Sequence, residues 1–270
     1  MLNSRRSPRT APTPLRVAVL SSRRAPGLAD LLADPGRGRH WDLVAFVASD
    51  PACADLARVR AVPAPAIVHD IRGFYTARGA RVTDLGPRAE YDRRTVELLA
   101  PLHPDLVVLS GYLHILTAPA LEAFPNRIVN IHDADLTVLE AGGRPRYRGL
   151  RSTRDAVFAG ARETRSTVHL VTPEVDVGPL LVRSWAFPVP GVVEQARDLR
   201  SGDVLKAYAY AQREWMMCAA WGPLLARTIE LFARGDVRLL DARPVVAGAL
   251  GPLELPAPPP RAGLLGAVGG

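Results

Sequence analysis

Residues 104–132 read PDLVVLSGYLHILTAPALEAFPNRIVNIH, and the order of patterns in this stretch decides the fold. The run PDLVVLS (104–110) is rich in apolar and β-branched residues, as is typical of a central strand in a parallel sheet. A helical segment at 118–124 follows, and RIVNIH (127–132) is a second buried strand. A strand, a helix and another strand in this order predict a parallel sheet with helices on both faces.

The same alternation of strands and helices extends towards both ends of the chain. Towards the N-terminus it predicts strands at 16–22, 42–49 and 65–68, and helices at 27–32, 52–59 and 91–102. Towards the C-terminus it predicts longer strands at 166–172 and 179–187 that could be antiparallel, a long helix at 203–233, and a hairpin or strand at 234–246. The chain is therefore expected to be an α/β protein with a mostly parallel twisted sheet.

Composition changes at the two ends of the chain. Residues 1–15 are basic and rich in Pro and Ser, without the apolar stretch of a signal peptide, which predicts a disordered extension. Residues 16–246 are expected to form a single domain. Residues 247–270 contain PAPPP and GLLGAVGG, and from Gly251 they are expected to be a disordered low-complexity tail.

The overall composition is that of a soluble globular protein, with 48% hydrophobic and 23% charged residues and a mean hydropathy of +0.05. The net charge of +7 comes almost wholly from arginine, since Lys206 is the only lysine. These arginines are scattered, which argues against nucleic acid as a partner and is compatible with an anionic small molecule. No apolar run reaches membrane-spanning length. The spacing of Cys53 and Cys218 matches neither a disulfide framework nor a zinc site, which favours a cytoplasmic protein. The protein is expected to be a monomer or a homodimer.

The strand at 127–132 ends in two polar side chains. Because side chains alternate in a strand, Asn130 and His132 point to the same face. Ligands of such sheets bind beyond the carboxyl ends of the strands. An amide, a histidine and a nearby carboxylate can polarise a carbonyl and relay a proton; the acidic candidates are Asp133, Asp135, Glu174 and Asp176. From the residues alone, a capped strand end with a satisfied histidine is the favoured alternative.

Other candidate residues have simpler explanations. The loop SSRRAPGL (21–28) could hold an anion at the helix that follows, but it is neither a dinucleotide-binding nor a P-loop motif. Its arginines, Arg23 and Arg24, fit a solvated turn better than a phosphate clamp. His114 is expected to face solvent, and His169 is expected to be a satisfied core residue. A third set is better explained by core packing than by a cofactor site: Trp215, Met216, Met217 and Trp221.

Four segments taken together resemble the glycinamide ribonucleotide formyltransferases and their folate-dependent relatives: PDLVVLSGYLHIL (104–116), RIVNIH (127–132), YRGLRSTRDAV (147–157) and STVHLVTPEVDVGPLL (166–181). The specific part is N-I-H followed by V-H-x-V-T-x-x-x-D-x-G-P. The resemblance implies a Rossmann-like formyltransferase fold. It also implies transfer of a formyl group from 10-formyltetrahydrofolate to a small-molecule amine, by default glycinamide ribonucleotide in purine biosynthesis.

The resemblance also implies roles for individual residues. It implies no metal ion in the site. The catalytic set would be Asn130, His132 and Asp176. Folate would lie against Leu113, His114, Ile115, Leu116, Thr172 and Glu174. The amine substrate would contact Ser22, Arg23, Arg24 and Gly27.

The chain departs from the family pattern in two places. Where relatives that bind the ribonucleotide have G-x-G-S-N, this chain has the loop at 21–28, in which Pro26 lacks an N–H, and the loop is closer to that of formyltetrahydrofolate deformylases. The segment HDADLT (132–137) stands where the family has H-P-S-L-L-P, and the stretch 133–146 is longer. Hydrolysis of the formyl-folate and a non-catalytic folate-binding paralogue are therefore retained as alternatives.

Overall fold

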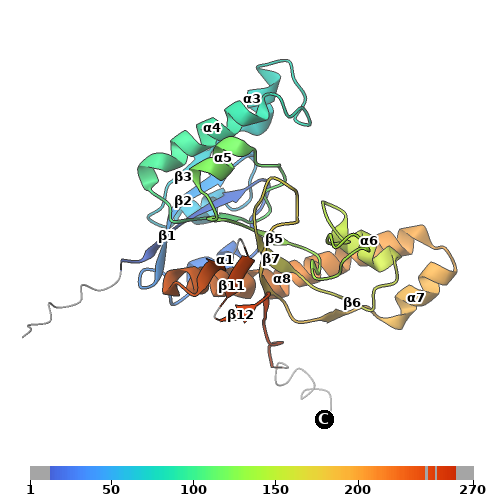
Figure 1. Ribbon diagram of the computed structural model, residues 1–270. Coiled ribbons are helices and arrows are strands. Elements are labelled where there is room, and N and C mark those ends of the chain that lie inside the picture. Colours follow the sequence, from blue (N-terminus) through green and yellow to red (C-terminus); the bar gives the residue numbers. More distant parts are fainter. Residues whose placement is uncertain (1–12, 241–242, 247, 260–270) are drawn as a thin grey trace, which may run out of the picture.

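The computed structural model describes residues 13–240, 243–246 and 248–259 (Figure 1). Within these residues, the main sheet has the order β13-β8-β7-β5-β4-β1-β2-β3. Its strands are β1 (Leu15–Ser21), β2 (Trp41–Ala48), β3 (Ala66–Val68), β4 (Leu106–Leu109), β5 (Ile128–His132), β7 (Thr167–Leu170), β8 (Leu180–Arg183) and β13 (Leu253–Glu254). Two small sheets pair β6 (Glu163–Thr164) with β9 (Phe187–Pro188), and β10 (Val237–Leu240) with β11 (Arg243–Val246) and β12 (Ala249–Leu250).

The main sheet is parallel from β3 to β5, and β7 then pairs antiparallel with both β5 and β8. This arrangement confirms the predicted mostly parallel α/β fold. The chain starts at β1 in the middle, builds β2 and β3 on one side, and returns to add β4 and β5 on the other side. Such a reversal of strand order opens a crevice at the carboxyl ends of the central strands, where ligands of open α/β sheets bind.

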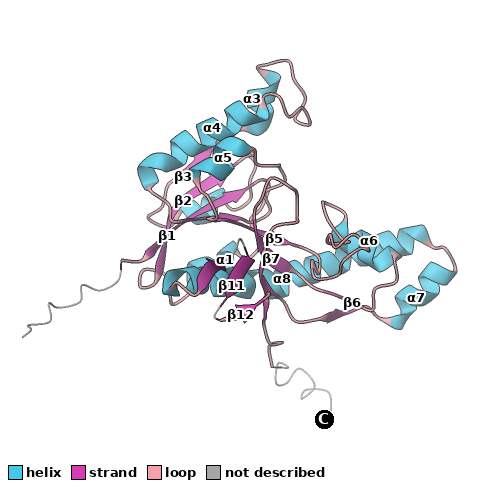
Figure 2. Ribbon diagram, in the orientation of Figure 1, coloured by secondary structure: helices cyan, strands magenta, loops and turns pink. Residues whose placement is uncertain are grey.

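Helices cover both faces of the sheet, as Figures 1 and 2 show. In chain order they are α1 (Leu28–Ala33), α2 (Leu56–Arg60), α3 (Ile71–Thr76), α4 (Arg88–Leu99), the 3₁₀ turn η1 (Ala100–Leu102), α5 (Ala118–Ala123), α6 (Ser152–Phe158), α7 (Gly191–Asp198) and α8 (Gly202–Arg234). Helices α4 and α5 pack on one face, and α1 and the long α8 pack on the other. Helix α8 ends where Gly235 takes the left-handed conformation, with φ of 73°.

Because successive side chains of a strand point to opposite faces of the sheet, the main sheet has a separate hydrophobic core on each face. Val17 and Val19 of β1 belong to the core that contains α1 and α8, whereas Ala18 and Leu20 belong to the core that contains α4 and α5. Because both faces are buried, the central strands are almost continuously apolar, which explains why they could be recognised in the sequence.

Some elements differ from expectation. The strand predicted at 179–187 ends at Arg183, and Phe187–Pro188 instead forms β9 of a separate small sheet. The tail expected from Gly251 contains β13, which pairs in parallel with β8. Most of the predicted N-terminal extension and the end of the tail lie outside the described residues. Helix α3 was not predicted. None of the described helices is both long and apolar enough to span a membrane.

Candidate active site

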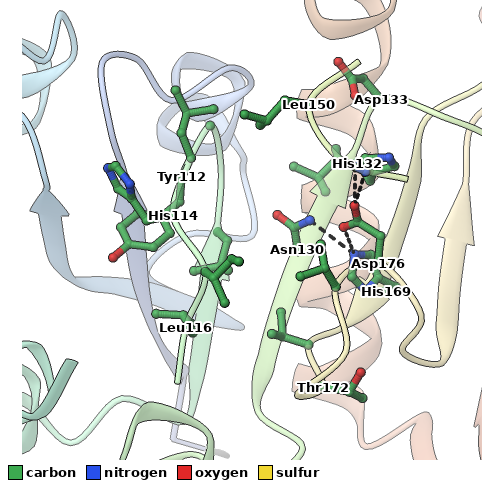
Figure 3. Close-up of a pocket in the computed structure, with 18 of the residues that line it drawn as sticks. Tyr112, His114, Leu116, Asn130, His132, Asp133, Leu150, His169, Thr172 and Asp176 are labelled. Carbon is green, nitrogen blue, oxygen red and sulfur yellow. Dashed lines mark hydrogen bonds and ion pairs between the residues drawn. The ribbon is translucent and has the colours of Figure 1, made fainter. Parts of the chain in front are cut away.

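A cavity of about 360 Å³ opens at the carboxyl ends of β4 and β5 (Figure 3). One wall is the segment after β4, with Tyr112, His114 and Leu116. The opposite wall is β5, with the β7–β8 loop behind it, and it carries all three predicted catalytic residues. The predicted folate-binding residues also line this cavity: Leu113, His114, Ile115, Leu116, Thr172 and Glu174. Its size and mixed lining are typical of a small-molecule site.

Strand β5 brings Asn130 and His132 to the cavity. Val129 and Ile131, which alternate with them, are buried in the core beneath, in contact with the α8 side of the sheet. Burying these two residues fixes which face the polar pair takes, since a slip of one residue would exchange the two faces. The polar end of this strand is therefore part of a cavity wall and more than a cap.

Asp176 lies between two histidines. Its Oδ2 is 3.6 Å from Nδ1 of His132, and its Oδ1 is 3.5 Å from Nε2 of His169 (Figure 3). The amide of Gly149 also donates to Oδ2 at 2.7 Å. Asp176 itself takes a left-handed conformation with φ of 56°. The turn that carries it needs a glycine, because a Cβ on Gly178 would lie 1.8 Å from the carbonyl oxygen of Leu170.

The environment of Asp176 keeps its carboxylate ionised. Burial by itself would raise its pKa, but the hydrogen bond to His169, the charge of His132 and the amide of Gly149 outweigh burial and lower the pKa to about 2. Asp176 therefore presents a fixed negative charge to both imidazole rings.

His169 belongs to the site, although it was predicted to be a satisfied core residue. Its Nδ1 donates to the carbonyl of Leu170 at 2.9 Å, and its Nε2 lies 3.5 Å from Oδ1 of Asp176. The amide nitrogen of Asn130 lies 3.2 Å from the same Nε2. The antiparallel register of β5 and β7 places Asn130 opposite His169. His169 therefore orients Asn130 and also contacts Asp176.

The segment after residue 146 holds His132 from the other side. Nε2 of His132 donates to the carbonyl of Tyr147 at 3.1 Å, while Nδ1 faces Asp176. The two ring nitrogens of His132 therefore each face an oxygen atom, which fixes the orientation of the ring. His132 and Asp176 are each 7% exposed, so this contact is shielded from water.

Asp133 follows His132 and is also buried. Its Oδ1 accepts from the hydroxyl of Ser152 at 2.7 Å, its Oδ2 accepts from Nε of Arg213 on α8, and its carbonyl accepts from Thr153. Asp133 thus ties the end of β5 to the start of α6 and to α8. Because Ser152 closely follows the segment that contacts His132, these contacts of Asp133 also support the cavity wall that carries His132.

We expect Asp133→Asn to lower the free energy of unfolding by about 1.5–3 kcal/mol, as is usual for losing a hydrogen bond to a charged group. The half-exposed Arg213, at 31% exposure, keeps the loss below that of a fully buried ion pair. Denaturant unfolding measures this loss. Asp155→Asn, on the exposed side of α6, is the control and should change stability little. Equal stability of the two variants would mean that these contacts of Asp133 contribute nothing.

Two hydrogen bonds hold the cavity wall that follows β4. The amide of Leu113 donates to Oγ of Ser22 at 3.0 Å, and Asp92 accepts from the amide of Thr117 at 2.6 Å. His114 does not face solvent as predicted: it is partly buried in the cavity wall. Burial, together with the positive charge of Arg88, lowers its pKa to about 4, so it is neutral at physiological pH.

The predicted amine-binding residues do not line this cavity. Ser22 is buried, and its hydroxyl bonds to Leu113 and to Ser49. Arg23 and Arg24 each face a carboxylate, and Gly27 packs against α8, where its Cβ would lie 2.7 Å from the amide of Gly222. Their role in binding remains a prediction. Among the described residues there is no cluster of His, Cys, Asp and Glu that could hold a metal ion.

Comparison with known proteins matches this chain to formyl transferases. The family profile described as "Formyl transferase" covers residues 15–190. The phosphoribosylglycinamide formyltransferase of Mycobacterium tuberculosis H37Rv is 32% identical over 179 residues, which is 66% of this chain and 72% of that protein. The formyltetrahydrofolate deformylase of Bacillus subtilis is 35% identical over 94 residues, which is 35% of this chain and 29% of that protein.

The same relationship is found among solved structures. The crystal structure of glycinamide ribonucleotide transformylase 1 from Symbiobacterium toebii aligns with a TM-score of 0.65 and 27% identity, over 86% of this chain and 94% of that one. Many of the curated relatives are matched only in part: the alignments cover between 12% and 47% of the lengths of six of them.

Proposed function

Because the chain belongs to the formyl transferase family, we propose that it transfers the formyl group of 10-formyltetrahydrofolate to an amine acceptor. The observation that carries this proposal is the contact of Asp176 with His132 and His169 beside Asn130, at the carboxyl end of β5. The names of the relatives make glycinamide ribonucleotide the first acceptor to test.

The proposed reaction forms one bond and breaks another at the formyl carbon. The acceptor amine attacks this carbon, and the carbonyl oxygen gains negative charge in the tetrahedral intermediate. The bond from the formyl carbon to N10 of the folate then breaks, and the proton lost by the amine ends on N10. The products are the N-formyl amine and tetrahydrofolate, so no oxidant or reductant is needed.

Three side chains would carry out these steps. Asn130 and the Nε2–H of His132 would donate to the developing oxyanion. In the absence of substrate this N–H points at the carbonyl of Tyr147, so the formyl oxygen would compete with that carbonyl for it. Asp176 would keep the imidazole protonated and oriented, and would help to move the proton of the amine.

The folate is proposed to lie between the 113–116 segment and the 172–176 loop, with its pteridine held mainly by backbone groups. We therefore expect His114→Ala to change the KM for 10-formyltetrahydrofolate by no more than about threefold, because the backbone donors remain. Steady-state kinetics at varied folate concentration measure this. A crystal structure with a folate analogue bound away from these two segments would contradict the placement.

The decisive assay incubates the purified protein with 10-formyltetrahydrofolate, with and without glycinamide ribonucleotide. Amine-dependent release of tetrahydrofolate with formation of the N-formyl product supports the proposal. Release of formate without any amine would indicate hydrolysis, which the similarity to the Bacillus subtilis deformylase makes the second candidate. Binding of folate without turnover would indicate a non-catalytic paralogue, against which the intact set of Asn130, His132 and Asp176 argues.

We also propose that the protein works in the cytoplasm on small molecules, without nucleic acid or membrane as a partner. Its state as a monomer or a homodimer stays a prediction, which sedimentation or light scattering can test.

A further inference from the structure

The loop between β1 and α1, residues 22–27, borders the cavity. It touches the wall at Gly111, where a Cβ would lie 2.2 Å from the carbonyl oxygen of Arg24. The resemblance places the amine substrate at this loop, so a phosphate on the acceptor would lie near Arg23 or Arg24. The contacts of the loop therefore bear on which acceptors fit.

Arg24 already holds a carboxylate of the chain itself. Its Nη1 donates to Oε2 of Glu214 on α8 at 2.9 Å, and its Nη2 donates to Oε1 of the same side chain. Nη2 also lies 3.9 Å from Sδ of Met217, so the guanidinium lies along α8. Two-point contacts of this kind are the strongest that arginine makes with an oxyanion. A phosphate at this guanidinium would lie beside the carboxylate of Glu214, and the two negative charges would repel each other.

The other charges around the loop are paired as well. Arg23 lies 3.7 Å from Asp50, and Arg58 contacts the buried Asp55. With the pair of Arg24 and Glu214, three arginines thus face three carboxylates. The loop carries no surplus positive charge for a phosphate dianion, although the whole chain has a net charge of +7.

Two backbone amides of the loop already have acceptors within the chain. The amide of Ser22 donates to the carbonyl of Gly111 at 3.1 Å, and the amide of Ala25 donates to Oδ2 of Asp55 at 2.7 Å. Pro26 has no N–H. Phosphate-binding loops depend on several backbone amides aimed at one point, and here these three positions cannot supply them.

We propose that Glu214 takes the place of an acceptor phosphate at Arg24, and that the physiological acceptor is an amine without a phosphate group. This inference rests on the proposed formyl transfer to an amine. Glu214 is then a specificity-determining residue: it fills the anion position from within the chain and repels a second anion.

Two acceptors that differ only in the phosphate test the proposal, namely glycinamide ribonucleotide and its dephosphorylated ribonucleoside. We expect the parent protein to formylate both with kcat/KM values within about threefold of each other. Glu214→Gln keeps the size of the side chain but removes its charge, and should favour the ribonucleotide by about tenfold through Arg24. Glu230→Gln, which removes a carboxylate paired with Arg227 on the same helix, is the control and should behave like the parent.

Binding of inorganic phosphate separates this inference from the proposed function. Calorimetric titration should show no saturable binding to the parent protein, and saturable binding to Glu214→Gln and Glu214→Ala. This measurement decides the inference even if neither amine is formylated, an outcome that would refute only the formyl transfer. A parent protein that binds phosphate or prefers the ribonucleotide tenfold overturns the inference, and so does a failure of both Glu214 variants to gain phosphate binding.

Discussion

Replacing His132 with alanine is expected to lower the turnover of 10-formyltetrahydrofolate by about 10²–10³, the usual effect of removing an oxyanion donor. Alanine removes the Nε2–H that faces the cavity wall and also the ring nitrogen beside Asp176. The dissociation constant of the folate should change by less than about threefold, because its proposed walls are other segments. Stopped-flow measurement of tetrahydrofolate release, with folate binding measured by fluorescence, gives both quantities.

The matched control is His40→Ala, since His40 is an exposed histidine far from β5 in the sequence. It should keep the rate of the parent protein. If His132→Ala also kept a rate close to that of the parent, the assignment of His132 to the chemistry would be wrong. If its folate affinity fell in proportion to the rate, His132 would be a binding residue instead.

The fold was largely predictable because both faces of the central strands are buried. Such strands are nearly continuous apolar runs, as in 104–110, and they alternate with helical segments at a spacing that leaves few topologies. The parts that were not predicted are short. Strand β13 has two residues, Leu253–Glu254, and its pairing with β8 depends on a partner about seventy positions away in the sequence. No local pattern carries that information.

The site was predictable in part, for a related reason. Asn130 and His132 were found from strand alternation, whereas Asp176 was one of four acidic candidates and was singled out only through the resemblance. His169 was missed because it lies in an apolar strand, and only the register of β7 against β5 shows that it faces Asn130. The pairing of Arg24 with Glu214 joins residues that are 190 positions apart, so the sequence alone could not indicate it.

Asp176→Asn is expected to lower turnover by at least about 10², because the negative charge that both histidines face would be lost. Asparagine is the informative substitution. It tolerates the left-handed conformation that Asp176 adopts at φ of 56°, and its amide oxygen can still accept from Gly149. The variant should therefore fold, and its loss of rate should reflect lost charge and not a rebuilt loop.

The same variant tests how the free energy of unfolding depends on pH. The pKa of Asp176 is lowered from 3.8 to about 2 in the folded protein, so its carboxylate stabilises the fold fully above about pH 4 and loses that contribution as the pH falls towards 2. A shift of this size corresponds to roughly 2–3 kcal/mol. Parent and variant should thus differ most in unfolding free energy near pH 6, and the difference should shrink as the pH falls from 4 towards 2. Denaturant unfolding from pH 6 to pH 3 measures this, with Asp155→Asn as the control. A stability difference that stays constant over this range, together with a rate close to that of the parent, would show that Asp176 is not the charged centre of the site.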